Sequence, residues 1–115
     1  MTVAGARPLF DPQPLRELAG ATNPKLVREL VEVFLRDSPA RLAEMRAAVR
    51  DGDAPRLCRE AHALGGNSAI LGATALAELC ELLEEPHDGV ARAVLVERVG
   101  EAYAQTIGPL KAGTP

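Results

Sequence analysis

His62 is the side chain best suited to act as a nucleophile in this 115-residue chain, which contains two histidines and two cysteines. A neutral imidazole nitrogen is nucleophilic near neutral pH because the ordinary pKa of histidine is about 6.5. Gly65 and Gly66 follow at the i+3 and i+4 positions, and Ala69 lies one turn further on the same side of a helix. The pattern predicts an exposed imidazole beside a bare surface that another protein can approach.

A metal site is the first alternative for these residues. Cys58 and His62 are one helical turn apart and could share an ion. Only Cys80 and His87 remain as soft ligands, while a structural zinc site needs four ligands at recognisable spacing. Cys80 fits the packed face of its helix, and His87, in a Pro-His-Asp-Gly turn, is expected to be solvated. We therefore expect no metal and no cofactor, which metal analysis of the purified protein would test.

Acid–base catalysis is a second alternative. Glu81, Glu84 and Glu85 could provide paired carboxylates, but charged residues on a helix surface are usually solvated. No set of nucleophile, base and orienting residue can be recognised around them. We expect a chain that is not an enzyme.

The element that holds His62 is a predicted helix with a regular apolar phase. Spacings of four and three join the residues of its buried face, which are Leu57, Ala61, Leu64, Ser68 and Leu71. Gly65 and Gly66 should each destabilise the helix by about 0.8–1 kcal/mol relative to Ala. They could end the helix, but the apolar phase continues past them. We therefore predict a continuous helix that stops at Gly72.

Two helices are expected before this one. Asp11 with Pro12 marks the start of a short helix that ends near Gly20, and Asn23 caps a long helix that follows. The stripe keeps its phase across Pro39, which favours one kinked helix over two. The residues expected to face the core are Leu26, Leu30, Val33, Phe34, Leu42, Met45 and Val49.

Two more helices are expected after it. The first carries Leu76, Leu79, Cys80 and Leu83 on one side. The second carries Val96, Val99, Tyr103, Ile107 and Leu110. Amphipathic helices joined by short loops predict an all-α, up-and-down bundle.

The composition excludes several functions. A net charge of −3 and a pI near 5.4 argue against a nucleic-acid binder. The sequence contains no polybasic patch and no apolar run of about 20 residues, so nothing in it indicates a membrane protein. Residues 1–10 have no apolar signal sequence, so we expect a cytoplasmic protein with reduced cysteines.

Residues 61–84 resemble the signature of the histidine-phosphotransfer (HPt) family. The run Ala-His-Ala-Leu-Gly-Gly-Asn-Ser, then Leu-Gly-Ala, then a Leu-x-x-Leu-Cys-x-x-Leu-Glu helix is similar to that family's pattern of His-x-Leu-Lys-Gly-x-Ser followed by the same elements. Upstream, Val-Phe-Leu at 33–35, Asp-Ser-Pro at 37–39 and Asp-Gly-Asp at 51–53 are also similar to the family. The resemblance covers roughly residues 10–110.

The resemblance implies an antiparallel up-and-down four-helix bundle with a short extra N-terminal helix. We expect this HPt-like bundle over residues 11–111, after a flexible N-terminal arm over residues 1–10. It implies that His62 accepts a phosphoryl group from an aspartyl phosphate of a receiver domain and passes it to another. Gly66 matches the glycine that lets the receiver approach, and Ser68 matches the serine of the motif.

The expected partners are response-regulator receiver domains and a hybrid histidine kinase. They would bind a monomeric protein on the face around His62, at Cys58, Arg59, Gly65, Gly66 and Ala69. The family usually has Lys where this chain has Gly65, and a Lys there would attract the charge of the phosphate. Arg59, three residues before His62, is a hypothetical substitute cation.

The departure at Gly65 leaves two further interpretations open. A degenerate HPt-like adaptor would bind a receiver or a kinase without being phosphorylated. A helical bundle with an unrelated partner would neither bind a receiver nor accept phosphate.

Overall fold

The computed structural model describes residues 8–115 and contains five helices and no strand within that range. Residues 1–7, most of the expected N-terminal arm, lie outside the described part. The prediction of an all-α protein is confirmed. The helices are α1 (Gln13–Ala21), α2 (Pro24–Arg50), α3 (Ala54–Ile70), α4 (Thr74–Leu83) and α5 (Gly89–Gly113).

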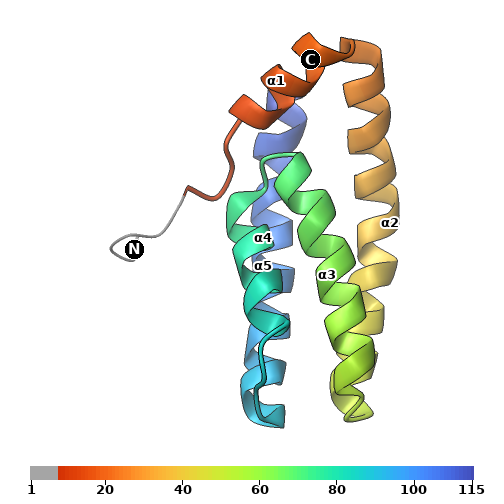
Figure 1. Cartoon of the computed structure of the whole chain (residues 1–115), viewed down its shortest axis with the longest axis vertical. Helices are drawn as coiled ribbons and strands as arrows, with labels where there is room; N and C mark the ends of the chain where they lie inside the picture. The colour runs from red at the N-terminus through yellow and green to blue at the C-terminus, as the bar shows by residue number, and fades with distance from the viewer. Residues whose placement is uncertain (1–7) are drawn as a thin grey trace.

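Helices α2 to α5 form an antiparallel bundle (Figure 1). Helix α3 packs between α2 and α4, and α5 packs against both α2 and α4 from the other side. Helix α1 contacts α2 and crosses one end of the bundle, close to the C-terminus. The molecule measures 42 × 31 × 20 Å, so each face of the bundle is long enough to contact another protein domain.

Side-chain caps fix where three of the helices begin. A carboxylate or amide oxygen at the N-cap accepts a backbone N–H of the first turn, which otherwise has no partner in the helix. These bonds are 2.9 Å from Leu26 to Asn23, 3.1 Å from Arg56 to Asp53 and 2.8 Å from Ala91 to Asp88. Helix α1 begins two residues after Asp11, whose Oδ1 accepts the Gln13 N–H at 2.9 Å.

Helix α3 continues through Gly65 and Gly66 to Ile70, as its apolar phase predicts. Gly72 then ends it, with a φ of +83° that residues with a Cβ rarely adopt. A Cβ at Gly72 would also collide with the carbonyl oxygen of Asp11. The turn after α3 is therefore fixed both by its own backbone and by the segment that leads into α1.

Helix α2 is a single helix of 27 residues despite Pro39. Pro39 has no N–H to donate to the Leu35 carbonyl, so that acceptor needs another donor. The hydroxyl of Tyr103 on α5 donates to the Leu35 oxygen at 3.4 Å. A side chain of the neighbouring helix thus replaces the missing backbone hydrogen bond.

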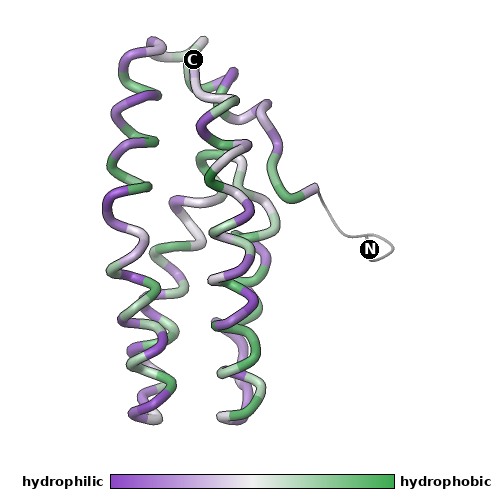
Figure 2. Tube along the Cα trace, turned by 180° about the vertical axis from the view of Figure 1, so that it is seen from behind, coloured by the Kyte–Doolittle hydropathy of each residue, from purple (hydrophilic) through white to green (hydrophobic). Residues whose placement is uncertain are grey.

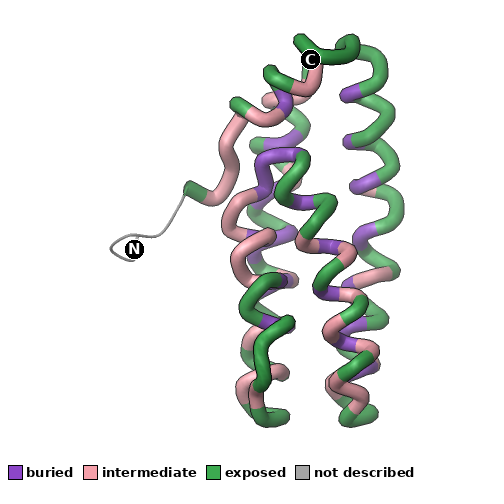
Figure 3. Tube along the Cα trace, in the orientation of Figure 1, coloured by how far each residue is buried: buried purple, intermediate pink, exposed green. Residues whose placement is uncertain are grey.

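The buried face of α2 differs from the predicted stripe in its first half. Val27 and Val31 are in the core, whereas Leu26, Leu30 and Val33 are 37–42% exposed. The sequence has two apolar rows here, about 100° apart around the helix. Only the row in phase with the buried residues Phe34, Leu42 and Met45 faces the other helices; Val49 is half-buried. Figure 3 shows the buried positions along one side of α2, and Figure 2 shows apolar residues outside that row as well.

Candidate functional site

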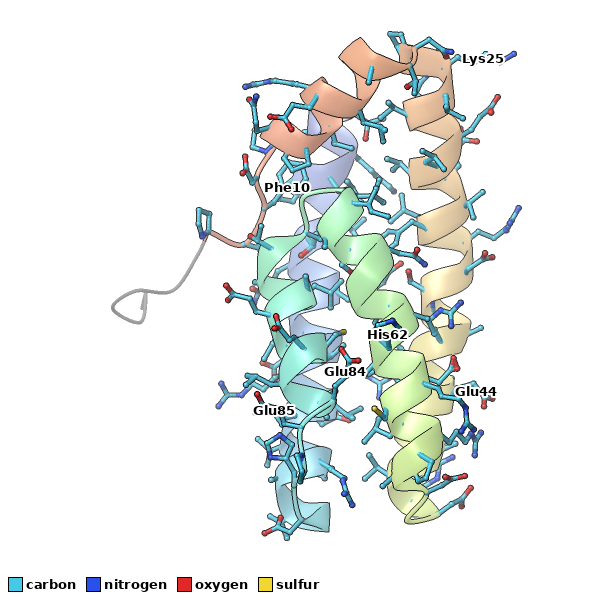
Figure 4. The ribbon with its side chains drawn as sticks, in the orientation of Figure 1. Phe10, Lys25, Glu44, His62, Glu84 and Glu85 are labelled. Atoms are coloured by element: carbon cyan, nitrogen blue, oxygen red, sulfur yellow. The ribbon has the colours of Figure 1, made fainter. Side chains whose placement is uncertain are left out.

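His62 lies midway along α3, and its side chain is 78% exposed (Figure 4). The residues before and after it in the core phase, Ala61 and Leu64, are 0% and 1% exposed. They hold the helix against the bundle, so the position of the imidazole is set by a packed element and not by a loop. A histidine held in this way can meet a partner without rearrangement of the backbone.

Glu84, the C-cap residue of α4, orients the ring of His62 (Figure 4). Its Oε1 lies 2.7 Å from Nδ1 of His62, and the glutamate side chain is 33% exposed. An ionised carboxylate can only accept a hydrogen bond, so Nδ1 carries the proton. In the neutral ring, the lone pair is then on Nε2, which has no hydrogen-bond partner among residues 8–115.

Glu81, Glu84 and Glu85 are all exposed, as expected for a solvated face, but Glu84 also contacts His62. Glu84 is 22 residues from His62 along the chain and caps the C-terminal end of α4. No local spacing connects the two residues. Their contact depends on how α3 and α4 pack, which a periodicity argument does not provide.

Gly65 and Gly66 have different surroundings. A Cβ at Gly66 would meet no atom within 4 Å, and Ala69 further along is exposed. A Cβ at Gly65 would lie 2.9 Å from Cβ of Cys80 on α4. The expectation that both glycines bare the surface beside His62 therefore fits Gly66, whereas Gly65 faces the neighbouring helix.

The two residues predicted on the N-terminal side of His62 also differ. Arg59 is exposed and forms no ion pair or hydrogen bond with any of the described residues. Cys58 is half-buried and has a free thiol. On the α2 side, Glu60 pairs with Arg41 at 3.0 Å, so Arg59 is the unpaired cation in this stretch of α3.

Cys80 is a buried thiol and not a reactive one. Burial, and secondly the negative charge of Glu84, raise its pKa to about 12, so the thiol is protonated at neutral pH. Within residues 8–115 no group of three or more His, Cys, Asp and Glu residues is arranged to hold a metal ion. His87 differs from the expected solvated residue, because it is half-buried and its Nε2 lies 2.7 Å from the Leu82 carbonyl oxygen.

A groove of about 140 Å³ runs between α2 and α3. It is mainly apolar, and Asn67 and Ile70 line it on the stretch of α3 that follows His62. Exposed side chains border it, with Leu30 at 38%, Val33 at 42% and Ile70 at 58%. The row of α2 that the core does not use therefore reaches the surface on the His62 side of the bundle.

Comparison with protein families finds the Hpt domain over residues 29–107. The chain belongs to the Hpt domain family. This family match confirms the resemblance noted in the sequence and includes the whole of α3 and α4, with His62 and Glu84.

A solved structure agrees with the assignment to the Hpt family. The chain is similar to the histidine-containing phosphotransfer protein B (HptB) of Pseudomonas aeruginosa PAO1, with 28% sequence identity and a TM-score of 0.80. The alignment covers 93% of this chain and 95% of HptB. A comparison with curated protein sequences finds no match. The four-helix bundle with an extra N-terminal helix is therefore the Hpt fold.

Ser68, the serine of the Hpt motif, is a buried residue of the helix and not part of the exposed surface. Ser68 is 0% exposed, and its hydroxyl donates to the Leu64 carbonyl at 2.6 Å. A small side chain that satisfies its own hydroxyl fits between packed helices.

None of the helices in residues 8–115 is long and apolar enough to cross a membrane.

Proposed function

We propose that this Hpt protein is a phosphoryl carrier of a two-component phosphorelay, with His62 as the phosphorylated residue. The observation that supports this most is that the two ring nitrogens of His62 have different surroundings. Nδ1 is held by Glu84, and Nε2 is left with a lone pair on an imidazole that is 78% exposed. Such a ring can attack phosphorus at the surface of another protein.

The transfer step exchanges one bond to phosphorus for another. Nε2 attacks the phosphorus of an aspartyl phosphate, the bond from phosphorus to the carboxylate oxygen breaks, and the aspartate leaves as a carboxylate. Positive charge develops on the ring as Nε2 gives up its lone pair. The carboxylate of Glu84 stabilises this charge through the Nδ1–H, as an acidic residue does for a catalytic histidine.

The charge on the transferring phosphoryl group needs a metal ion and a cation. The Hpt chain presents no carboxylate cluster for a metal within residues 8–115, so the receiver domain would supply Mg²⁺. This division makes the chain a carrier and substrate, not an enzyme. Its partners are response-regulator receiver domains and a hybrid histidine kinase.

The proposed docking face is centred on His62. It includes Gly66 and Ala69, which leave the helix surface low, and Cys58 and Arg59 before the histidine. The apolar groove between α2 and α3 extends it. A modest contact of this kind allows the fast exchange that a relay requires.

Intact-mass analysis after incubation with a phosphorylated receiver domain and Mg²⁺ tests the proposal. We expect an acid-labile phosphoryl adduct on the wild type that is absent from His62→Gln. His87→Gln is the matched control and should still be phosphorylated, because His87 lies in the loop after α4. If folded wild type binds several receivers and takes phosphate from none, the protein is the adaptor and not the carrier.

A further inference from the structure

Two contacts, one helical turn apart, join α3 to α4 beside the proposed phosphorylation site. Gly65 lies against Cys80, and His62 is hydrogen-bonded to Glu84. The helices are antiparallel, so one turn back along α3 corresponds to one turn forward along α4 (Figures 1 and 4). The distance between the helices at the first contact therefore sets the distance at the second.

The first contact is too close for any residue except glycine. A Cβ at Gly65 would lie 2.9 Å from Cβ of Cys80 and 3.8 Å from the Ala77 carbonyl oxygen. Carbon atoms in contact are normally about 3.5–4.0 Å apart. Cβ of Cys80 is attached directly to the backbone and cannot swing away, so a larger residue at position 65 requires α4 itself to move outward.

An outward movement of α4 would carry Glu84 with it. Cys80 and Glu84 are an i, i+4 pair on one side of the helix. The hydrogen bond between Oε1 of Glu84 and Nδ1 of His62 is 2.7 Å long, and an outward movement of Glu84 would lengthen and break it. Its loss would leave the ring free to rotate and to carry its proton on either nitrogen.

Access for a partner does not explain Gly65. Gly66 is exposed and open, and it already provides a low surface after His62. Gly65 is half-buried and turned towards α4. A glycine in the middle of a helix destabilises it, so its presence at position 65 needs an explanation. The close approach of α4 provides that explanation.

We infer that Gly65 is a positioning residue for His62, because the missing side chain lets α4 approach and deliver Glu84 to Nδ1. The inference rests on the carrier function proposed above. The family usually has Lys where this chain has Gly65, and the missing Lys was expected to weaken the attraction for the phosphate. The inference reverses that expectation. A Lys at position 65 brings a cation near the phosphate, but here it would separate Glu84 from the ring and impair phosphorylation.

The test uses Gly65→Ala and Gly65→Lys, with two readouts. The first is ¹⁵N NMR of the unphosphorylated protein, which reports whether the His62 proton is fixed on Nδ1. The second is the rate of phosphorylation by phosphoramidate, in which a bond from Nε2 to phosphorus forms and ammonia leaves. We expect both variants to lose the fixed tautomer and to be phosphorylated about ten- to hundredfold more slowly, by analogy with metal-bound histidines that lose their orienting partner. Glu84→Ala should give the same change.

Rescue across the helix interface separates positioning from a general structural effect. Gly65→Ala with Cys80→Gly removes the colliding atom and should restore the tautomer, whereas Gly65→Ala with Cys80→Ala keeps Cβ and should not. Gly66→Ala adds a Cβ in open space and should leave the NMR signature of His62 intact. A fixed Nδ1 proton in folded Gly65→Ala and Gly65→Lys, or its equal loss in Gly66→Ala, would overturn the inference.

The two proposals fail in different ways. Wild type that shows the fixed tautomer but accepts phosphate from neither phosphoramidate nor a receiver contradicts the carrier function. The NMR comparison of the Gly65 variants still decides the role of Gly65 in that case, because it uses the unphosphorylated protein.

Discussion

At His62, chemistry depends on which of two ring nitrogens holds the proton. Glu84 fixes the proton on Nδ1 from 2.7 Å and leaves the lone pair of the neutral ring on Nε2. A pairing of carboxylate and histidine is familiar from hydrolases, in which the histidine activates a serine. Here no serine or cysteine among residues 8–115 donates a hydrogen bond to Nε2 of the ring. The arrangement suits a histidine that is itself the nucleophile.

Arg59 is expected to prolong the life of the phosphorylated histidine. It is exposed, it has no partner in the described part of the chain, and it lies three residues before His62. Arg59→Ala should therefore shorten the lifetime of the phosphohistidine, measured as loss of the adduct mass with time. Arg36→Ala is a matched control, because Arg36 is exposed on α2 and already paired with Asp37. An unchanged lifetime in Arg59→Ala would exclude this role.

Cys80 should make the fold sensitive to alkaline pH. Its pKa is about 12 in the folded protein and near 9 in the unfolded chain, so the folded state keeps a proton that the unfolded state loses. The stability is therefore complete below about pH 9 and falls as the pH rises towards 12. Burial also raises the pKa of Tyr103, which acts in the same direction.

Urea unfolding between pH 8 and 11 measures this effect. We expect Cys80→Ala, which keeps Cβ but has no thiol to ionise, to lose less stability over that range than the wild type. Equal slopes for the two proteins would show that the thiol does not contribute.

At the scale of helices, Pro39 and Tyr103 form one unit. The Tyr103 hydroxyl donates to the Leu35 carbonyl that Pro39 leaves without a partner. Tyr103→Phe removes this donor in a buried place and should destabilise the protein by about 1 kcal/mol. For a domain of this size, the melting temperature should fall by a few degrees.

A double-mutant cycle tests whether Pro39 is the reason. Pro39→Ala restores a backbone N–H at residue 39, so Leu35 regains its helical partner. In that background, Tyr103→Phe should cost clearly less than in the wild type. If the cost is the same in both, the Tyr103 hydroxyl acts through another group, such as Ser38, and not through the Leu35 carbonyl.

The sequence predicts these helices well because their cause is local. Caps at Asn23 and Asp53 and the apolar spacing of α3 act within a few residues, and the continuity of α3 through two glycines followed from phase alone. The buried face of α2 was harder. Leu26 and Val27 are both apolar, and only the phase of the later residues Phe34, Leu42 and Met45 shows that Val27 is the buried one.

The site was predictable at His62 and not at the residue that orients it. His62 has a motif around it, whereas Glu84 is reached only through the packing of α4 on α3. The same limit applies to Gly65. Its spacing from His62 matches that of a surface residue, and the contact with Cys80 that gives it a different environment involves another helix.

At the scale of the whole molecule, the exposed apolar groove should strengthen partner binding without supporting the fold. Val33 and Ile70 border the groove and are 42% and 58% exposed. Val33→Asp and Ile70→Asp should each weaken the binding of a receiver domain roughly tenfold, which corresponds to about 1.4 kcal/mol. Titration of the receiver by calorimetry, with melting temperatures alongside, measures both properties.

Val94→Asp is the control for these variants. Val94 is 51% exposed and lies on α5, which does not line the groove. It should bind the receiver as the wild type does. Equal weakening by all three aspartates would point to net charge and not to the groove.

The midway position of one histidine on one face of a packed helix has a kinetic consequence. In the proposed carrier role, a donor and an acceptor that both need Nε2 of His62 compete for the same surface, so they bind one after the other. Flux through such a protein follows a ping-pong scheme. An excess of the unphosphorylated donor then slows the relay by occupying the face that the next partner requires, and the rate at which each partner leaves limits how fast the signal travels.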